Sequence, residues 1–297
     1  MRIISWNTSH RRREAAQAEA LLSRVPDIVA LQEVTLATLP VLMKVLQHGG
    51  LTHVGSTVGA DSAAITRGPR SYGVLIASRY PLVDDLECAL KVHWQEKALT
   101  SVCQTPACEV EVHTVHVPPG SSHAWVKVEV LESVYRCRAR AGTRPRVLCG
   151  DFNTPQWELS SGEVVTWAQR LDASGRVRAM RRKRKGSASR WDAAERNVLT
   201  KLGTFGYRDA FRSLHGYEVE AGSWLVRRSG REVLRRFDHL FVSAELRVIK
   251  CRYVHEWRAA GLSDHAAQER RGSGSPTTTT GAAGLSALKA SVTQTLI

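Results

Sequence analysis

A carboxylate and an amide stand two residues apart in this chain, as Asp151 and Asn153, directly after a short apolar segment. Residues 146–149 (Arg-Val-Leu-Cys) are typical of a buried strand, and Thr154-Pro155 ends it. Both polar side chains would therefore leave a rigid strand together, a placement that suits a general base and an amide that orients a phosphate. The same Asp-x-Asn spacing also occurs in ordinary turns, and taken alone it leaves the two interpretations open.

Other polar residues recur at the ends of predicted strands along the chain. Catalytic and binding groups are commonly carried by loops that a rigid sheet holds in place. Their recurrence therefore predicts one site assembled from distant segments. The strands are expected at residues 2–6, 27–32, 110–115 and 236–243, and the polar residues are Asn7, Glu33, His116, Asp238 and the triplet Ser263-Asp264-His265.

Seven short motifs carry these residues in a fixed order over residues 1–265: Trp6-Asn7, Gln32-Glu33, Tyr72-Gly73-Val74, His116-Val117-Pro118, Gly150-Asp151-Phe152-Asn153, Phe237-Asp238-His239 and Ser263-Asp264-His265. In this order they resemble the endonuclease/exonuclease/phosphatase superfamily, which includes exonuclease III, AP endonucleases, DNase I and neutral sphingomyelinases. The resemblance implies an α/β fold, a two-sheet, four-layer sandwich of the DNase I-like type. It also implies a metal-dependent phosphoesterase.

Hydrolysis of a phosphodiester needs a hard divalent cation to neutralise charge on the scissile phosphate, and oxygen atoms are the ligands that Mg²⁺ prefers. We expect Glu33 to be the main metal ligand, with Asp264 and Asn7 beside it, and Mn²⁺ to be a possible substitute for Mg²⁺. Mg²⁺ retains several waters, so one or two protein carboxylates suffice. The alternative for Glu33 is a residue that merely starts a helix.

The catalytic roles follow from what the reaction requires. We expect Asp151 to act as the general base and Asn153 to donate to it or to a phosphate oxygen. His265 is expected to donate to the negative charge that develops in the transition state. Asp238 would pair with His265, fix its tautomer and raise its pKa so that it stays cationic. The alternative is an Asp–His pair that is only structural.

Three further residues bear on substrate choice. His116 would bind the phosphate or protonate the leaving oxygen; DNase-like and sphingomyelinase-like relatives carry His at this place, whereas AP endonucleases tend to carry an aromatic hydroxyl. Tyr72 is a second candidate phosphate donor, with packing in the core as its alternative. Trp224 would stack on a substrate or pack. His239 should face away from Asp238 across its strand.

The charge balance favours a polyanionic partner, and nucleic acid is the commonest. The chain has 42 Lys and Arg against 28 Asp and Glu, a formal net charge of +14. Part of this excess lies in residues 176–190, which include Arg182 and Arg184 among Gly and Ser. We expect a flexible loop that follows phosphates; the alternative is a disordered insert with no contact.

Composition restricts the remaining possibilities. No apolar run is long enough to cross a membrane, and a first strand from Arg2 leaves no room for a signal peptide. Six cysteines show no metal-ligand spacing, so we expect buried free thiols and a reducing, cytoplasmic location. A Cys103–Cys108 disulfide is the alternative. The sequence indicates no protein partner.

Periodicity predicts alternating helices and strands. Helices are expected over residues 14–25, 36–48, 124–140 and 191–202, and further strands over 53–57, 73–77, 86–91, 98–102, 109–115, 237–242 and 248–254.

The character of the chain changes after residue 266. Gly, Ser, Pro and four consecutive Thr predict a disordered tail over residues 267–297, which leaves residues 1–266 as the catalytic domain. Relatives normally place a strand after the Ser-Asp-His motif, whereas residues 266–270 make a poor strand. We therefore expect a weakened sheet edge.

These observations favour a Mg²⁺-dependent nuclease that acts on DNA or RNA. The main alternative is a phosphatase or a phospholipase-type, sphingomyelinase-like hydrolase of small or lipid phosphoesters, since the same motifs serve both. A catalytically silent binding protein is a third possibility, and the full motif set argues against it.

Overall fold

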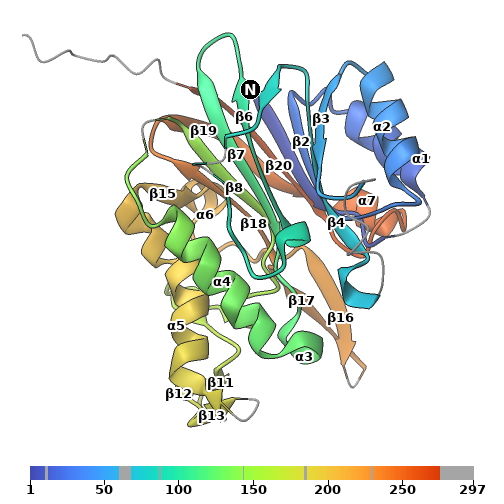
Figure 1. Cartoon of the computed structure of the whole chain (residues 1–297). Coiled ribbons are helices and arrows are strands. Elements are labelled where there is room, and N and C mark those ends of the chain that lie inside the picture. The colour runs from blue at the N-terminus through green and yellow to red at the C-terminus, as the bar shows by residue number, and fades with distance from the viewer. Residues whose placement is uncertain are drawn as a thin grey trace, which may run out of the picture.

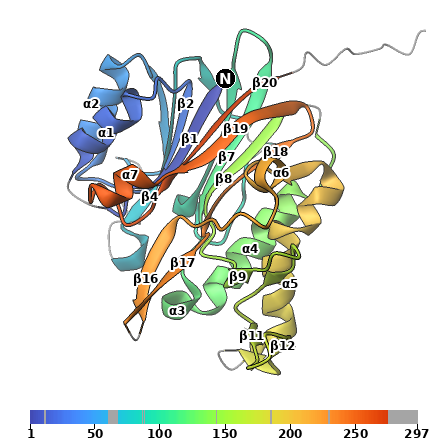
Figure 2. The same ribbon diagram turned by 180° about the vertical axis from the view of Figure 1, so that it is seen from behind.

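The computed structural model of this 297-residue chain describes residues 1–10, 13–59, 68–85, 87, 89–142, 144–183, 186–228 and 230–274. Within these residues, two six-stranded sheets pack face to face, and helices cover both outer surfaces (Figures 1 and 2). The predicted two-sheet, four-layer α/β sandwich is confirmed.

The first sheet is built around two parallel strands from the start of the chain. β1 (Arg2–Asn7) pairs with β2 (Ile28–Thr35), and Asn7 lies opposite Gln32. Parallel neighbours end at the same edge of a sheet, so Asn7 and Glu33 come close together there. The spatial order is β19 (Leu246–Val254), β20 (Ala267–Gly274), β1, β2, β4 (Tyr72–Ser78) and β3 (His53–Ser56).

The second sheet brings three functional residues to one level. β7 (Glu109–His116) runs parallel to β8 (Arg146–Asp151), with His116 opposite Asp151. β18 (Asp238–Ser243) pairs antiparallel with β8 and places Asp238 opposite Asp151 on the other side. The spatial order is β15 (Tyr207–Asp209), β18, β8, β7, β6 (Ala98–Gln104) and β5 (Leu82–Val83).

Alternation along the central strands divides their apolar residues between two faces. Inward residues such as Ile3, Ile28 and Val147 form the core between the sheets. Outward residues pack against helices, α1 (Glu14–Leu22), α2 (Leu39–His48) and α7 (His255–Ala259) on the first sheet. On the second sheet the helices are α4 (Trp125–Arg138) and α5 (Ala188–Leu199).

Short elements complete the described fold. The hairpins are β9 (Trp157–Glu158) with β10 (Val164–Val165), β11 (Gln169–Leu171) with β12 (Val177–Ala179), β13 (Arg182–Lys183) with β14 (Gly186–Ser187), and β16 (Trp224–Arg228) with β17 (Arg231–Arg235). The short helices are η2 (Gly68–Arg70), η3 (Gln95–Lys97), α3 (Gly120–His123), η4 (Lys201–Phe205) and α6 (Arg212–His215).

The expected weakness of the last strand is wrong. Residues 267–274, predicted to begin the tail, form β20, which lies between β1 and β19 and pairs with both. The charged residues of this segment make a strand look unfavourable from the sequence. In the structure they are accommodated by ion pairs with neighbouring strands: Glu269 lies 3.4 Å from Arg2 and 3.0 Å from Arg252. The rest of the predicted tail, residues 275–297, lies outside the described residues.

A second strand prediction is also wrong. The described part of residues 86–91 forms no strand, because the chain leaves the sheet edge after β5. There the Leu90 amide donates to the Thr100 hydroxyl, 3.2 Å away, instead of to a neighbouring strand.

Cys103 and Cys108 are free thiols, so the alternative disulfide is not formed. Within the described residues, no helix has the length and apolar character needed to cross a membrane.

Candidate active site

Glu33 reaches the site through an irregularity in its strand. The pairing of β2 with β4 shifts register between Gln32 and Val34, and Glu33 adopts a φ of 60°. Left-handed backbone is uncommon for a residue with a side chain, and a bulge of this kind re-aims a side chain. Glu33 Oε1 consequently lies 3.6 Å from His116 Nε2, across the gap between the two sheets.

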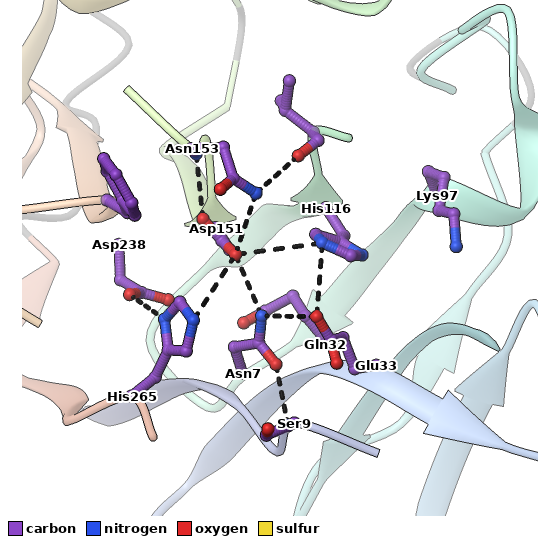
Figure 3. A network of polar contacts seen from close by, with 12 residues as sticks. Asn7, Ser9, Gln32, Glu33, Lys97, His116, Asp151, Asn153, Asp238 and His265 are labelled. Atoms are coloured by element: carbon purple, nitrogen blue, oxygen red, sulfur yellow. Dashed lines mark hydrogen bonds and ion pairs between the residues drawn. The ribbon is translucent and has the colours of Figure 1, made fainter. Parts of the chain in front are cut away.

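Asp151 stands at the centre of the polar network (Figure 3). Its Oδ2 accepts from Asn7 Nδ2 at 2.9 Å and from Asn153 Nδ2 at 3.2 Å. Its Oδ1 accepts from the Asn153 backbone amide at 2.9 Å. The Nε2 atoms of His116 and His265 lie 3.8 Å and 3.9 Å from the same carboxylate. One buried carboxylate therefore connects strand ends from both sheets.

The backbone around Asp151 depends on its neighbours. Gly150 has a φ of 137°, and a Cβ there would lie 1.9 Å from the Val115 carbonyl oxygen, so only glycine fits. Asn153 adopts a φ of 51°, which Asn tolerates better than most residues, and its Nδ2 also donates to the Val117 carbonyl at 2.9 Å. The tetrapeptide is thus a fixed support for its two polar side chains.

His265 is fixed by hydrogen bonds to its ring and to its backbone. Its Nδ1 lies 2.7 Å from Asp238 Oδ2, and its carbonyl accepts from the indole of Trp6 at 3.0 Å. The Ser263 hydroxyl donates to the Asn7 carbonyl at 2.7 Å and accepts from the His265 amide at 3.0 Å. These bonds fasten the Ser-Asp-His loop onto the end of β1.

Burial and charge set the ionisation of this pair. Burial lowers the pKa of His265, but the carboxylates of Asp238 and Asp151 outweigh it and raise the pKa to about 10. His265 is therefore an imidazolium near neutral pH. Burial, reinforced by the charge of Asp238, raises the pKa of Asp151 to about 8.

Glu33 and His116 shift in other directions. Burial would raise the pKa of Glu33, but a 2.6 Å contact with His10 Nδ1 and electrostatic interactions with His116 and His265 lower it to about 2. Burial lowers the pKa of His116 to about 3, which makes it neutral near pH 7. Glu33 is thus an anion and His116 a neutral donor or acceptor.

The donor atoms at this edge fit a hard divalent cation. The buried Oδ1 of Asp264 has no hydrogen-bond partner, while its Oδ2 accepts from the indole of Trp224 at 3.3 Å. Such an oxygen has room either to accept from a water or to ligate a cation. Among the described residues, two groups have ligand atoms within 4.8 Å of one another: Glu33, His116 and Asp151, and Asp151, Asp238 and His265.

The side-chain amide of Asn7 turns its nitrogen, not its oxygen, toward the carboxylates of Glu33 and Asp151. Its Nδ2 donates to both Asp151 and Glu33, at 2.9 Å and 3.2 Å, and its Oδ1 accepts from the Ser9 amide at 2.8 Å. In this orientation the amide bridges the two carboxylates, and ligation would require the amide to turn over.

A cavity of about 510 Å³ opens beside the network. Its size is typical of a small-molecule site. The lining has two parts. The polar lining consists of Glu33, His116, Ser121, Asp151, Asn153, Asp264 and His265, and the aromatic lining consists of Tyr72, Trp167, Trp191, Trp224 and Phe237, with Pro119 and Gly120 beside them.

The sequence profile of the Endonuclease/Exonuclease/phosphatase family matches residues 4–265 of this chain. The chain belongs to this family. It is accordingly a hydrolytic enzyme of the Endonuclease/Exonuclease/phosphatase type. No curated protein matches the sequence.

Three solved structures share this family fold. An AP endonuclease from Archaeoglobus fulgidus is 18% identical, with a TM-score of 0.65, and the match covers 92% of this chain and 99% of that one. The 3′ phosphatase NExo from Neisseria, bound to a product DNA hairpin, is 22% identical, with a TM-score of 0.58 and the same coverage. A family member from Beutenbergia cavernae is 17% identical, with a TM-score of 0.58, covering 91% and 70%.

Most residues predicted from the family motifs meet at this cavity. Asn7 and Asp238 do not line the cavity themselves, but they bond to lining residues, Asn7 to Asp151 and Asp238 to His265. Tyr72 lines the cavity with its ring 5.5 Å from that of His116, and Trp224, at the start of β16, forms a β-bridge with His265. His239 faces away from the site, as predicted, and its Nε2 lies 2.8 Å from the Thr154 carbonyl oxygen.

The predicted basic loop is more regular than expected. Residues 176–190 contain β12, β13, β14 and the first turn of α5, because short strands pair locally into hairpins. Arg178 and Arg190 form ion pairs with Asp172 and Glu132. Arg182 lies in β13, and Arg184 lies outside the described residues.

Sequence reasoning missed Lys97 and His10. Lys97 is buried, with its Nζ 3.6 Å from the centre of the Tyr72 ring and 2.5 Å from the Tyr72 carbonyl oxygen. Burial lowers the pKa of Lys97 to about 8. His10 stands three residues after Asn7, a proximity that could have indicated it. No comparable signal marks Lys97.

Proposed function

We propose that this protein is a Mg²⁺-dependent phosphodiesterase that cleaves DNA or RNA. The observation that carries the proposal is the position of Asp151, whose carboxylate contacts the Asn7 and Asn153 amides and faces His116 and His265 beside a cavity. This arrangement supports a reaction in which a base, an imidazolium and neutral donors would surround the scissile phosphate.

The residues divide the chemistry among them. Asp151 would take the proton from the attacking water, because its carboxylate lines the cavity and is held by the Asn7 and Asn153 amides. Asn153 would hold that carboxylate, and the His265 imidazolium, fixed by Asp238, would donate to the developing charge. His116, neutral and adjacent, would contact a phosphate oxygen.

Glu33 and Asp264 would hold Mg²⁺, for which Mn²⁺ would substitute; when bound, the ion supplies neutralisation of charge on the scissile phosphate. Asn7 would keep Glu33 and Asp151 at the correct separation.

The formal net charge of +14 supports nucleic acid as the substrate. Arg182 and Arg184 stay predicted phosphate contacts. The free thiols of the described cysteines support the predicted cytoplasmic location, because a reducing compartment leaves thiols unpaired.

A second candidate is a phosphatase or phospholipase-type hydrolase of small or lipid phosphoesters. The cavity of about 510 Å³ favours it, since this volume suits a small molecule better than an extended polymer.

The deciding experiment incubates purified protein and Mg²⁺ with plasmid, single-stranded DNA, abasic duplex, RNA and bis-p-nitrophenyl phosphate. Asp151→Asn serves as the control for contaminating nuclease. Cleavage of a nucleic acid that is lost with EDTA and in the variant is the expected result. Turnover of the small diester alone would favour the second candidate.

A further inference from the structure

Three rings form a continuous aromatic wall on the cavity: Trp224, Phe237 and Trp167. Trp224 and Phe237 are stacked, with centroids 5.3 Å apart and an interplanar angle of 24°. Phe237 and Trp167 follow at 6.3 Å and 48°. The wall lies directly beside the polar lining, because the Trp224 indole donates to Asp264 and the Trp224 backbone forms a β-bridge with His265.

Trp167 is held by a buried ion pair behind the wall. Its backbone amide donates to Glu195 Oε2 at 2.9 Å, and its indole donates to the Asn153 carbonyl at 3.1 Å. Lys127 Nζ donates to Glu195 at 2.6 Å and to the same Asn153 carbonyl at 3.0 Å. Both N–H donors of Trp167 are therefore used by the protein, and what this residue offers the cavity is its ring.

Trp191 supports the same arrangement from α5. It is fully buried, and its indole donates to Glu195 Oε1 at 2.7 Å. Gly120 lets the chain pass close to this ring, since a Cβ there would come within 2.5 Å of it. The wall is thus fixed before any ligand binds, which lowers the entropic cost of stacking.

We propose that the aromatic wall stacks on the nucleobase of the nucleotide that carries the scissile phosphate. The polar lining takes the phosphate and the wall takes the base, so one nucleotide spans the cavity. A base inside an intact duplex has both faces covered and must be extruded to reach such a pocket. The enzyme would accordingly act on unpaired or terminal nucleotides. This inference rests on the proposed phosphodiesterase activity.

The test compares substrates that differ only in the base. Thymidine 5′- and 3′-(p-nitrophenyl phosphate) are assayed against the same esters of 1,2-dideoxyribose, which lack the base. For the better isomer, kcat/KM is expected to fall by about 10-fold when the base is removed, the size of effect that base–aromatic stacking produces. A ratio near one, or faster turnover of the compound without a base, would overturn the proposal.

Variants assign the effect to the wall. Trp167→Ala should reduce the ratio to below about 3-fold, whereas Trp167→Phe should keep most of it, because a ring is retained. Trp94→Ala is the matched control, since Trp94 is a half-buried tryptophan outside the cavity lining. Loss of folding or of phosphate chemistry affects both substrates equally and leaves the ratio unchanged. A ratio that survives in Trp167→Ala would contradict the assignment.

A binding measurement separates this inference from the proposed function. If neither ester is hydrolysed, the phosphodiesterase proposal fails, and calorimetry of thymidine monophosphate against dideoxyribose 5-phosphate then tests the wall. Tighter binding of the nucleotide by about 10-fold, lost in Trp167→Ala, is expected. Equal binding of the two compounds would overturn the inference.

Discussion

The polar lining and the aromatic wall of one cavity are built in different ways. Polar residues such as Asp151 and His116 stand at the ends of central strands, at positions that strand pairing alone brings together. Trp167 instead follows a two-residue strand and is placed by side-chain bonds to Glu195 and to the Asn153 loop.

This difference separates chemistry from selectivity. Residues at the strand ends are positioned by the sheets themselves, so the geometry of the reaction is tied to the architecture. Residues fixed by a local ion pair between helices can be exchanged while the sheets stay intact. We therefore expect damage to the polar lining to remove turnover, and damage around the aromatic wall to change which substrate is preferred.

The largest expected effect is that of Asp151→Asn. An amide cannot accept the proton of the attacking water, so kcat should fall by roughly 10²–10⁴-fold on every substrate that is cleaved. The isosteric change keeps the shape, and circular dichroism should show an unchanged fold. Full activity in this variant would show that another group acts as the base.

The second effect concerns the support of the aromatic wall. Glu195→Gln leaves the buried Lys127 ammonium without its counter-charge, which should cost about 3–5 kcal/mol of unfolding free energy in urea titrations. The double variant Lys127→Met/Glu195→Gln should recover part of this loss. In both variants the preference for base-containing esters should fall more than turnover of bis-p-nitrophenyl phosphate. An equal fall in both would mean that the ion pair also supports the polar lining.

Much of the fold and the polar lining could be predicted from the sequence, because the signals lie in short segments of the chain. Asp151 and Asn153 are two residues apart, and Glu33 directly follows a buried segment, so pattern and position coincide. β20 could not be predicted, since Glu269 and its arginine partners become acceptable in a strand only once they pair across the sheet. Lys97 and Trp167 likewise gain their roles from contacts distant in sequence.

The third prediction tests metal binding at the polar lining. Glu33→Gln keeps the hydrogen bond from Asn7 but removes the anionic ligand, so half-saturation should require about 10–100-fold more Mg²⁺. The measurement is a Mg²⁺ titration of activity, with EDTA abolishing turnover in the unmodified enzyme. Glu163→Gln, an exposed surface carboxylate outside the cavity lining, is the control. An unchanged titration would remove Glu33 from the metal site.

The smallest effect concerns acid stability of the framework beneath the Asn153 loop. Arg236 contacts Glu158 at 2.6 Å and Asp209 at 2.7 Å, and all three are buried or nearly so. Burial alone would raise the pKa of Asp209 and Glu158, but the Arg236 charge outweighs it and holds each pKa below its usual range.

A carboxyl with a depressed pKa in the folded state binds fewer protons than in the unfolded chain, so its contribution is present above about pH 4.5 and is lost as pH falls further. The free energy of unfolding in urea should therefore decline below about pH 4.5, by more than 1 kcal/mol between about pH 4.5 and about pH 3. Glu158→Gln should lower stability near neutral pH and flatten this decline. A decline that is as steep in the variant would place the acid sensitivity in other carboxylates.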